Sequence, residues 1–279
     1  VREGGFASYP EQIDGPKRRV RPESFKDHFS QATLFWKSMS PVEQDHIVGA
    51  FSFELAKVER EPIRQRVLDR MLANIDGQLA ERVAANIGLT VERFAPPEGK
   101  RNGKAAKLAA SPALSLLNQP QSAKTRKVAI LAAPGVADAD VAAMKKALAA
   151  AGVRALVIAP RLGVLAGVGG TVAVDHTLVT MPSVVFDAVY LPGGPDSVQV
   201  LAEDGDAVHF IAEAYRHCKA IAVTGEATEL LDAAGIRADG EPVDGLIVAD
   251  DAHEAAAPFL AAIAAHRAWA RADKDAVPA

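Results

Sequence analysis

From Lys127 onward the sequence alternates between short apolar segments and longer segments with the apolar spacing of helices. Parallel strands that follow one another in the chain need a long crossover, which is usually a helix. The alternation therefore predicts an α/β fold over residues 127–279, with a doubly wound parallel sheet. The predicted strands are KVAILAA, VRALVIAP, FDAVYLPGG, AIAVTG and LIVAD, with a hairpin in LAGVGGTVAV and a long terminal helix in EAAAPFLAAIAAHRAWAR.

Composition excludes several classes of protein. The net charge of −4 argues against a nucleic-acid-binding domain, which is usually strongly basic. No apolar run reaches the roughly 18 residues of a membrane span, so we expect neither nucleic acid nor membrane as a partner. The single cysteine, Cys218, excludes an internal disulfide framework and a multi-cysteine zinc site, and it fits a reducing, cytoplasmic location. HEAAA at His253 lacks the second histidine of a zinc-protease motif, so no metal site is predicted.

Three different segments precede the predicted sheet. Residues 1–22 are rich in Gly, Pro and Arg and predict an extended arm that could wrap around a larger body. Residues 23–90 predict a small all-α domain, and residues 91–126 have the composition of a linker. Within the linker, ALSLL is an apolar island that we expect to anchor it to a surface, and the basic run is best read as solvated: Lys100, Arg101, Lys104 and Lys107. The N-terminus has no signal-peptide core. It also has no initiator Met, so we expect the chain to be part of something longer.

The predicted helical domain has clear start signals. SPVE places Ser40 at an N-cap and Glu43 at the matching capping-box position, and Asp76 can cap a later helix that stops near Gly88. A face made of Ile63, Val67, Met71 and Ile75 is predicted for the helix that begins at Pro62. The domain has more large apolar side chains than so short a block buries alone, which leaves two alternatives, an internal core or docking onto another domain: Phe29, Leu34, Phe35, Trp36, Phe51 and Phe53.

Two predicted strands end in turns suited to a site. Ligands of doubly wound sheets bind at the carboxyl ends of the strands. At one end, Gly193 and Gly194 could point backbone N–H groups into a crevice, as an oxyanion hole requires. At the other, AVTGEA forms the strand-to-helix elbow that usually presents a nucleophile.

FDAVYLPGG followed by KAIAVTGEA resembles the class I glutamine amidotransferase and intracellular-protease superfamily. The resemblance implies a flavodoxin-like fold, oxyanion glycines in the PGG turn, and a cysteine and a histidine where this chain has Gly225 and Glu226. Glycine cannot attack a substrate, and Thr224 is a weak nucleophile without an adjacent base. Glu226 could in principle be that base, but adjacent residues at such a turn usually point apart.

No other residue is expected to replace the missing nucleophile. Asp138 and Asp140, after the first strand, are better explained as helix caps than as an acidic partner. Cys218 precedes its strand, at the end opposite the crevice, and is predicted to be a half-buried structural thiol. We therefore predict a vestigial crevice of five residues with no catalytic role: Gly193, Gly194, Thr224, Gly225 and Glu226.

The whole chain resembles the C-terminal portion of large-subunit haem catalases. GGFASYPEQIDGPKRR, FKDHFSQATLFWKSMSPVEQDHIVGAFSFELAKV and IRQRVLDRMLANIDGQLAERVAANIGL carry the resemblance, together with the tail AHRAWARADKDAVPA. It implies a catalase-type helical domain followed by the flavodoxin-like domain, and a parent enzyme that converts hydrogen peroxide to water and oxygen. The family's haem ligand and distal residues lie in an upstream β-barrel core. Tyr9, Tyr190 and Tyr215 do not match the ligand motif, so no haem-binding residue is predicted in this chain.

The resemblance suggests a non-catalytic segment that stabilises the catalase core and helps to assemble a homo-oligomer, a tetramer in this family. Two alternatives stay open. One is a holdase-like binding module that uses the aromatic helical block, which mutation of Phe35 and Trp36 would test. The other is a hydrolase of the amidotransferase superfamily, which Gly225 disfavours.

Overall fold

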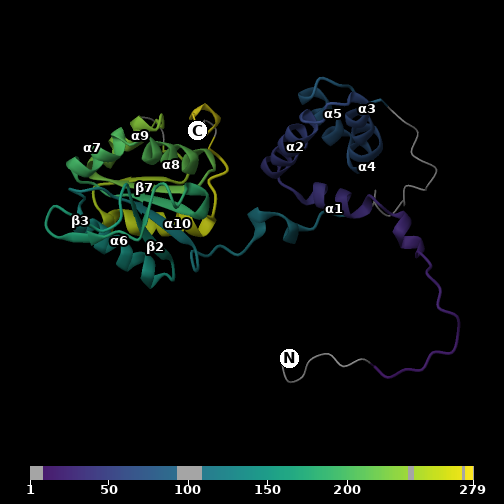
Figure 1. Cartoon of the computed structure of the whole chain (residues 1–279), viewed down its shortest axis with the longest axis horizontal. Helices are drawn as coiled ribbons and strands as arrows, with labels where there is room; N and C mark the ends of the chain where they lie inside the picture. Colours follow the sequence, from purple (N-terminus) through teal and green to yellow (C-terminus); the bar gives the residue numbers. More distant parts are fainter. Residues whose placement is uncertain (1–8, 93–108, 238–241, 272–273, 279) are drawn as a thin grey trace. The chain divides into compact units, whose positions relative to one another are not determined.

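A computed structural model describes residues 9–92, 109–237, 242–271 and 274–278. The chain divides into two compact units, Val1–Gln119 and Pro120–Ala279 (Figure 1). The first unit is helical and the second is an α/β unit, as predicted. The prediction for the basic run of the linker lies outside the described residues, and no described helix is long and apolar enough to cross a membrane.

The second unit contains a six-stranded sheet in which every neighbouring pair is parallel. Its order is β5-β2-β1-β6-β7-β8. Without the edge strand β5, this is the flavodoxin-like order 2-1-3-4-5, in which the order of successive strands reverses between β1 and β6. The strands are β1 (Lys127–Leu131), β2 (Arg154–Ala159), β5 (His176–Thr177), β6 (Ala188–Leu191), β7 (Ala220–Thr224) and β8 (Leu246–Ala249). The predicted fold class is confirmed.

Helices cover both faces of this sheet (Figure 1). Successive residues of a strand point to opposite faces of the sheet, and each face has its own hydrophobic core. In β1, Ala129 and Leu131 pack on one face, and Val128 and Ile130 pack on the other. The first face is covered by α7 (Pro195–Glu203), α8 (Gly205–Arg216) and α9 (Thr228–Ala233), and the second by α6 (Asp138–Ala150) and α10 (Ala252–Ala265). Since both faces are buried, the strands consist of apolar runs rather than alternating patterns.

The predicted hairpin is present, as β3 (Val164–Ala166) paired antiparallel with β4 (Thr171–Ala173). The prediction that Asp138 and Asp140 are helix caps was wrong. The N-cap of α6 is Ala137, with no side-chain cap, and Asp138 and Asp140 lie inside the first turn. The Asp138 carboxylate instead accepts a hydrogen bond from the Gly169 N–H in the hairpin turn (2.8 Å). That bond lowers the pKa of Asp138.

The terminal helix is shorter than predicted. It ends at Ala265, and His266 has a φ of 73°, which stops a right-handed helix. The chain then turns so that the buried Arg271 guanidinium donates to the carbonyl oxygens of Tyr215, in the last turn of α8, and of Asp244 (both 2.8 Å). A cation at the carbonyl end of a helix is favourable, and this contact replaces the predicted helical turn.

The helical unit packs around one small core made of Trp36, Val48, Leu55, Leu68, Leu72, Leu79, Ala80, Val83 and Ala84. Its elements are a short 3₁₀ turn (Glu23–Lys26), α1 (Ser30–Ser38), α2 (Pro41–Ala56), α3 (Glu61–Val67), a π-helical turn (Leu68–Leu72), α4 (Ala73–Ile75) and α5 (Gly77–Asn86). The π turn rotates the apolar face, so Leu68 and Leu72 are buried and Met71 is exposed, contrary to the prediction. Residues 9–22 form no regular element.

Glu43 ties the apolar island of the linker to this unit. Its side chain completes the predicted capping box of α2 by accepting from the Ser40 N–H (2.8 Å). The same carboxylate accepts from the Ser115 hydroxyl (2.8 Å) and the Leu116 N–H (2.7 Å). Burial pulls the pKa of Glu43 upward, but these hydrogen bonds outweigh it and lower the pKa overall. ALSLL is anchored as predicted, but the Glu43 carboxylate supplies the contact, and the apolar basis of the prediction was wrong because the leucines of this segment are exposed.

We predict that Glu43→Gln loosens residues 111–118. A neutral amide accepts more weakly than a carboxylate, so exchange of the Leu116 amide with deuterium should accelerate about 10-fold or more. Because folding lowers the pKa of Glu43, its contribution is complete above the unfolded-state pKa and is lost as the pH falls through the folded-state pKa.

Lowering the pH should therefore reduce the difference in Leu116 amide exchange rate between the wild type and Glu43→Gln. Glu54→Gln, an exposed change on the same helix, is the control and should leave exchange unchanged. Equal protection of Leu116 in the wild type and Glu43→Gln at neutral pH would contradict the assignment.

Candidate functional site

The five residues of the predicted crevice come together at the carboxyl ends of β6 and β7. These strands are parallel neighbours, with Leu191 opposite Val223, so the turns that follow them face one another. Gly193 and Gly194 lie between β6 and α7, and Thr224 ends β7. A short 3₁₀ turn, Gly225–Ala227, leads from β7 into α9.

Thr224 forms the buried base of the crevice. Its hydroxyl lies 2.9 Å from the Tyr190 hydroxyl and accepts the Gly193 N–H at 3.3 Å. Thr224 and Tyr190 are both fully buried, and burial raises the pKa of Tyr190 above its usual value. The Thr224 oxygen is thus committed to two internal partners and is not available as a nucleophile.

Glu226 occupies the mouth of the crevice. Its Oε2 accepts the Gly194 N–H at 3.2 Å. Its own backbone N–H and then the Gly194 N–H hold the pKa of Glu226 below its usual value, so the group is a carboxylate at neutral pH. It does not contact Thr224 as a general base would, because it points across the turn to the opposite strand end.

Gly194 and Gly225 differ in the space that a side chain would have. Gly194 has a φ of 112°, and a Cβ there would clash with the Gly135 carbonyl oxygen and lie 2.8 Å from the Ala137 nitrogen. Gly225 has a φ of 55°, and a Cβ there would meet only the Gly193 Cα, at 3.8 Å. The turn after β1 therefore packs directly on Gly194, whereas the elbow at Gly225 keeps the backbone shape of a nucleophile turn with free space beside it.

Other polar contacts near the sheet were not predicted. Ser197, fully buried in α7, accepts the Ala133 N–H at 2.9 Å and holds the turn after β1. At the opposite edge, the buried Lys219 ammonium donates to the Ser183 hydroxyl (3.1 Å), and burial lowers the pKa of Lys219 to about 8. Ser183 and Lys219 are 5% and 3% exposed, which leaves no room for a substrate beside the hydroxyl. The only signal for these contacts was an isolated polar residue in or beside an apolar segment.

Cys218 lies at the amino end of β7, opposite the crevice, as predicted. It is 1% exposed, so the prediction of a half-buried thiol was wrong in degree. It ends α8 with a φ of 56°, and its N–H donates to the Tyr215 carbonyl oxygen at 2.9 Å. Its position is structural.

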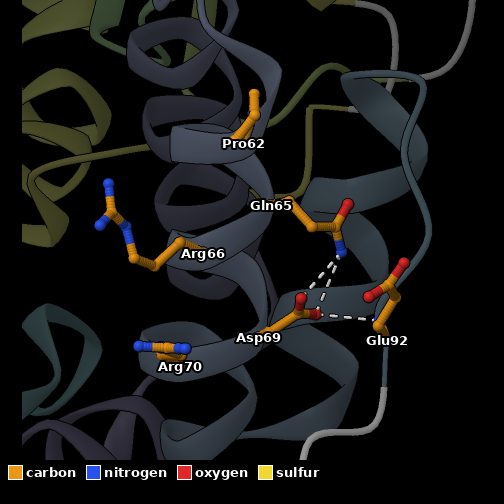
Figure 2. A pocket seen from close by; sticks show the side chains of 6 residues that line it. All are labelled: Pro62, Gln65, Arg66, Asp69, Arg70 and Glu92. Atoms are coloured by element: carbon orange, nitrogen blue, oxygen red, sulfur yellow. Dashed lines mark hydrogen bonds between the residues drawn. The ribbon is translucent and has the colours of Figure 1, made fainter.

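The helical unit carries an open pocket of about 360 Å³ lined by Pro62, Gln65, Arg66, Asp69, Arg70 and Glu92 (Figure 2). Its buried carboxylate, on Asp69, accepts from the Gln65 amide (3.0 Å) and the Glu92 N–H (2.9 Å). The Gln65 amide also donates to the Thr90 carbonyl oxygen at 2.8 Å. These bonds attach residues 90–92 to the helix, so the polar groups at the floor of the pocket are used structurally.

Comparison with known proteins gives two family matches. Residues 124–273 match the C-terminal domain found in long catalases, and residues 22–87 match the catalase-related immune-responsive family. The first match covers more than half of the chain. The chain belongs to the long catalases. It corresponds to a C-terminal portion of them.

Individual long catalases align with nearly the entire chain. Catalase HPII of Pseudomonas putida is 46% identical over 100% of the chain, and catalase HPII of Pseudomonas aeruginosa is 44% identical over the same share. Catalase-2 of Bacillus subtilis is 38% identical over 96% of it. In each case the alignment spans only 38% of the relative's length.

The described residues do not fit a haem. A catalase haem needs an axial tyrosine. Tyr190 and Tyr215 are fully buried inside the α/β unit, the first bonded to Thr224 and the second covered by the Arg271 guanidinium 4.1 Å from its ring centre. Tyr9 is 84% exposed in the arm. No group of three or more metal-ligating side chains occurs among the residues whose positions are described.

We predict that Gly194→Ala in this long-catalase segment costs much more stability than Gly225→Ala. Both sites have positive φ, but only Gly194 has backbone atoms where the methyl group would go. We expect a loss of about 1 kcal/mol for Gly225→Ala and at least about 3 kcal/mol for Gly194→Ala, measured by urea unfolding of the α/β unit in the full chain. Equal losses would contradict the described packing of the turn after β1.

A second prediction concerns the buried hydroxyl of Thr224. Thr224→Val keeps the shape but leaves the Tyr190 hydroxyl and the Gly193 N–H without their shared partner, at a cost of about 1–3 kcal/mol. Tyr190→Phe removes one bond and leaves the other, so it should cost less. Thr224→Ser retains the hydroxyl and is the control. Urea unfolding that ranked Tyr190→Phe as the most damaging of the three would exclude Thr224 as the centre of the network.

Proposed function

We propose that this chain is a non-catalytic part of a haem catalase, and that it stabilises the haem-containing core and the assembly of subunits. The observation that carries the proposal is an alignment with proteins named catalases. It includes the entire chain and spans 38% of the length of each relative. Two further features support it: the described residues do not fit a haem, and the crevice of the α/β unit lacks a nucleophile. The parent reaction would be the conversion of hydrogen peroxide to water and oxygen, with the haem held by residues outside this segment.

The surface of the helical unit supports a docking role. Phe25, Phe35, Phe51 and Phe53 are 52%, 47%, 37% and 63% exposed, although the unit has a core of its own. Contiguous apolar patches mark interaction surfaces, and we propose that these phenylalanines contribute to one. Trp36 is 5% exposed and belongs to the internal core, so the docking alternative concerns only the exposed phenylalanines. We infer that the exposed phenylalanines contact the rest of the catalase, and that the arm wraps a neighbouring subunit of a tetramer in the cytoplasm.

The two alternative functions have less support. A hydrolase would need a nucleophile in the crevice, where Gly225 has no side chain and Thr224 is bonded internally. A holdase-like module would use the exposed phenylalanines to bind unfolded clients. We favour the catalase partner because the relatives named catalases contain both the segment and a much longer remainder.

The proposal is tested by exchanging segments in catalase HPII of Pseudomonas putida. One variant lacks the stretch that aligns with this chain, and another carries this chain in its place. We expect the replacement to retain haem, subunit assembly and peroxide turnover. The deletion variant should lose half of its activity at a temperature about 10 °C or more below that of the intact enzyme. We expect this shift because the deletion would remove several kcal/mol from the free energy of unfolding.

The docking surface is tested in the same replacement enzyme. Phe35→Ser with Phe53→Ser should lower its resistance to heat without unfolding the isolated chain, and exposed Glu54→Gln is the matched control. Oxygen evolution by the isolated chain supplied with haem would contradict a non-catalytic role. A deletion enzyme that assembles and resists heat like the intact one would contradict the stabilising role.

A further inference from the structure

We propose that the turns after β6 and β7 form a carboxylate-binding site that the chain's own Glu226 occupies. The crevice is then closed by an intramolecular contact, and it accepts a small external carboxylate once the Glu226 side chain is removed. This inference is independent of any role in a catalase, because it concerns only the α/β unit.

The Glu226 carboxylate accepts a backbone donor from the neighbouring strand end. This donor is the Gly194 N–H, which follows β6 and lies 3.2 Å from Oε2. The N–H of Glu226 itself, which follows β7, also lowers the pKa of the carboxylate. Hydrolases with a nucleophile elbow build their oxyanion hole from the N–H after the nucleophile and a second N–H from another loop. Glu226 directly follows the elbow glycine, so its N–H corresponds to the first of these donors, and its carboxylate accepts from the N–H of the other turn.

The shape of the turns suits this occupant. A Cβ at Gly193 would lie 3.0 Å from Oε2 of Glu226, so the glycine lets the carboxylate approach the backbone closely. On the other side, the position of a Cβ on Gly225 is open. Truncation of Glu226 would thus free the Gly194 N–H and leave beside it the space of the removed carboxylate. Formate and acetate have that size and charge.

A simpler role for Glu226 is a turn-stabilising contact with no capacity for another ligand. The two interpretations differ in one measurable respect. A turn contact predicts only a loss of stability when Glu226 is truncated. A carboxylate-binding site predicts that an external carboxylate restores the lost hydrogen bond, because the donor is held in place by β6, β7 and the turn after β1 rather than by Glu226.

The experiment uses the full chain labelled with ¹⁵N. Sodium acetate is titrated at constant ionic strength, with chloride as the balancing anion, into the wild type, Glu226→Ala and the control Glu229→Ala. We expect saturable shifts of the Gly194 and residue-226 amides in Glu226→Ala alone, with a dissociation constant in the millimolar range for so small a ligand. Acetate shifts of equal size in the wild type, or none in a folded Glu226→Ala, would overturn the proposal.

A second variant keeps the test valid if Glu226→Ala does not fold. Glu226→Gln retains the shape but loses the charge, so the Gly194 amide proton should move upfield, as for a weaker hydrogen bond, and should not respond to acetate. An unchanged Gly194 shift would show that the carboxylate is not its partner. Because folding lowers the pKa of Glu226, acid should move the wild-type Gly194 signal toward its position in Glu226→Gln, and a pH-independent wild-type signal would count equally against the proposal.

Discussion

The parallel pairing of β6 with β7 is the constraint on which the α/β unit depends. It places the turn at Gly193–Gly194 beside the turn at Gly225, and the buried hydroxyl of Thr224 connects them. The turn after β1 then closes on Gly194 so tightly that no side chain fits there. The chain's own polar groups therefore satisfy backbone N–H groups at these strand ends, which water or a substrate would otherwise do.

Several carboxylates of the chain also satisfy backbone N–H groups. Each accepts a backbone N–H from a segment distant in sequence: Glu43 from Leu116, Asp69 from Glu92, Asp138 from Gly169, Asp175 from Val157, Asp187 from Lys127 and Glu226 from Gly194. Charged acceptors make stronger hydrogen bonds than neutral ones, and each of these bonds joins two segments that are distant in the sequence. The acidic residues in these positions are accounted for by architecture, without assigning any of them to catalysis.

The fold was predictable because its signals are local and repeated. Apolar runs of strand length separated by helices allow essentially one architecture, and the cap at Ser40 and the hairpin at Gly169–Gly170 have strong sequence signatures. The errors occurred where tertiary contacts outweigh local pattern. The π turn at Leu68–Leu72 moved Met71 to the surface, and Arg271 left its predicted helix to bind carbonyl groups of α8 and of the segment before β8. The five crevice residues could be brought together from topology alone, but the partner of Glu226 could not, because a rotamer decides whether it faces Thr224 or Gly194.

The glycine at position 225 and the carboxylate at position 226 are best understood together. Gly225 has no side chain that could react, and the buried Gly194 N–H needs an acceptor, because an unpaired buried donor destabilises a fold. The carboxylate of Glu226 supplies that acceptor. The contact thus satisfies a backbone donor at an elbow that carries no side-chain nucleophile. Under the proposed function this arrangement has an advantage, because an exposed, activated thiol at the elbow would be oxidised by peroxide.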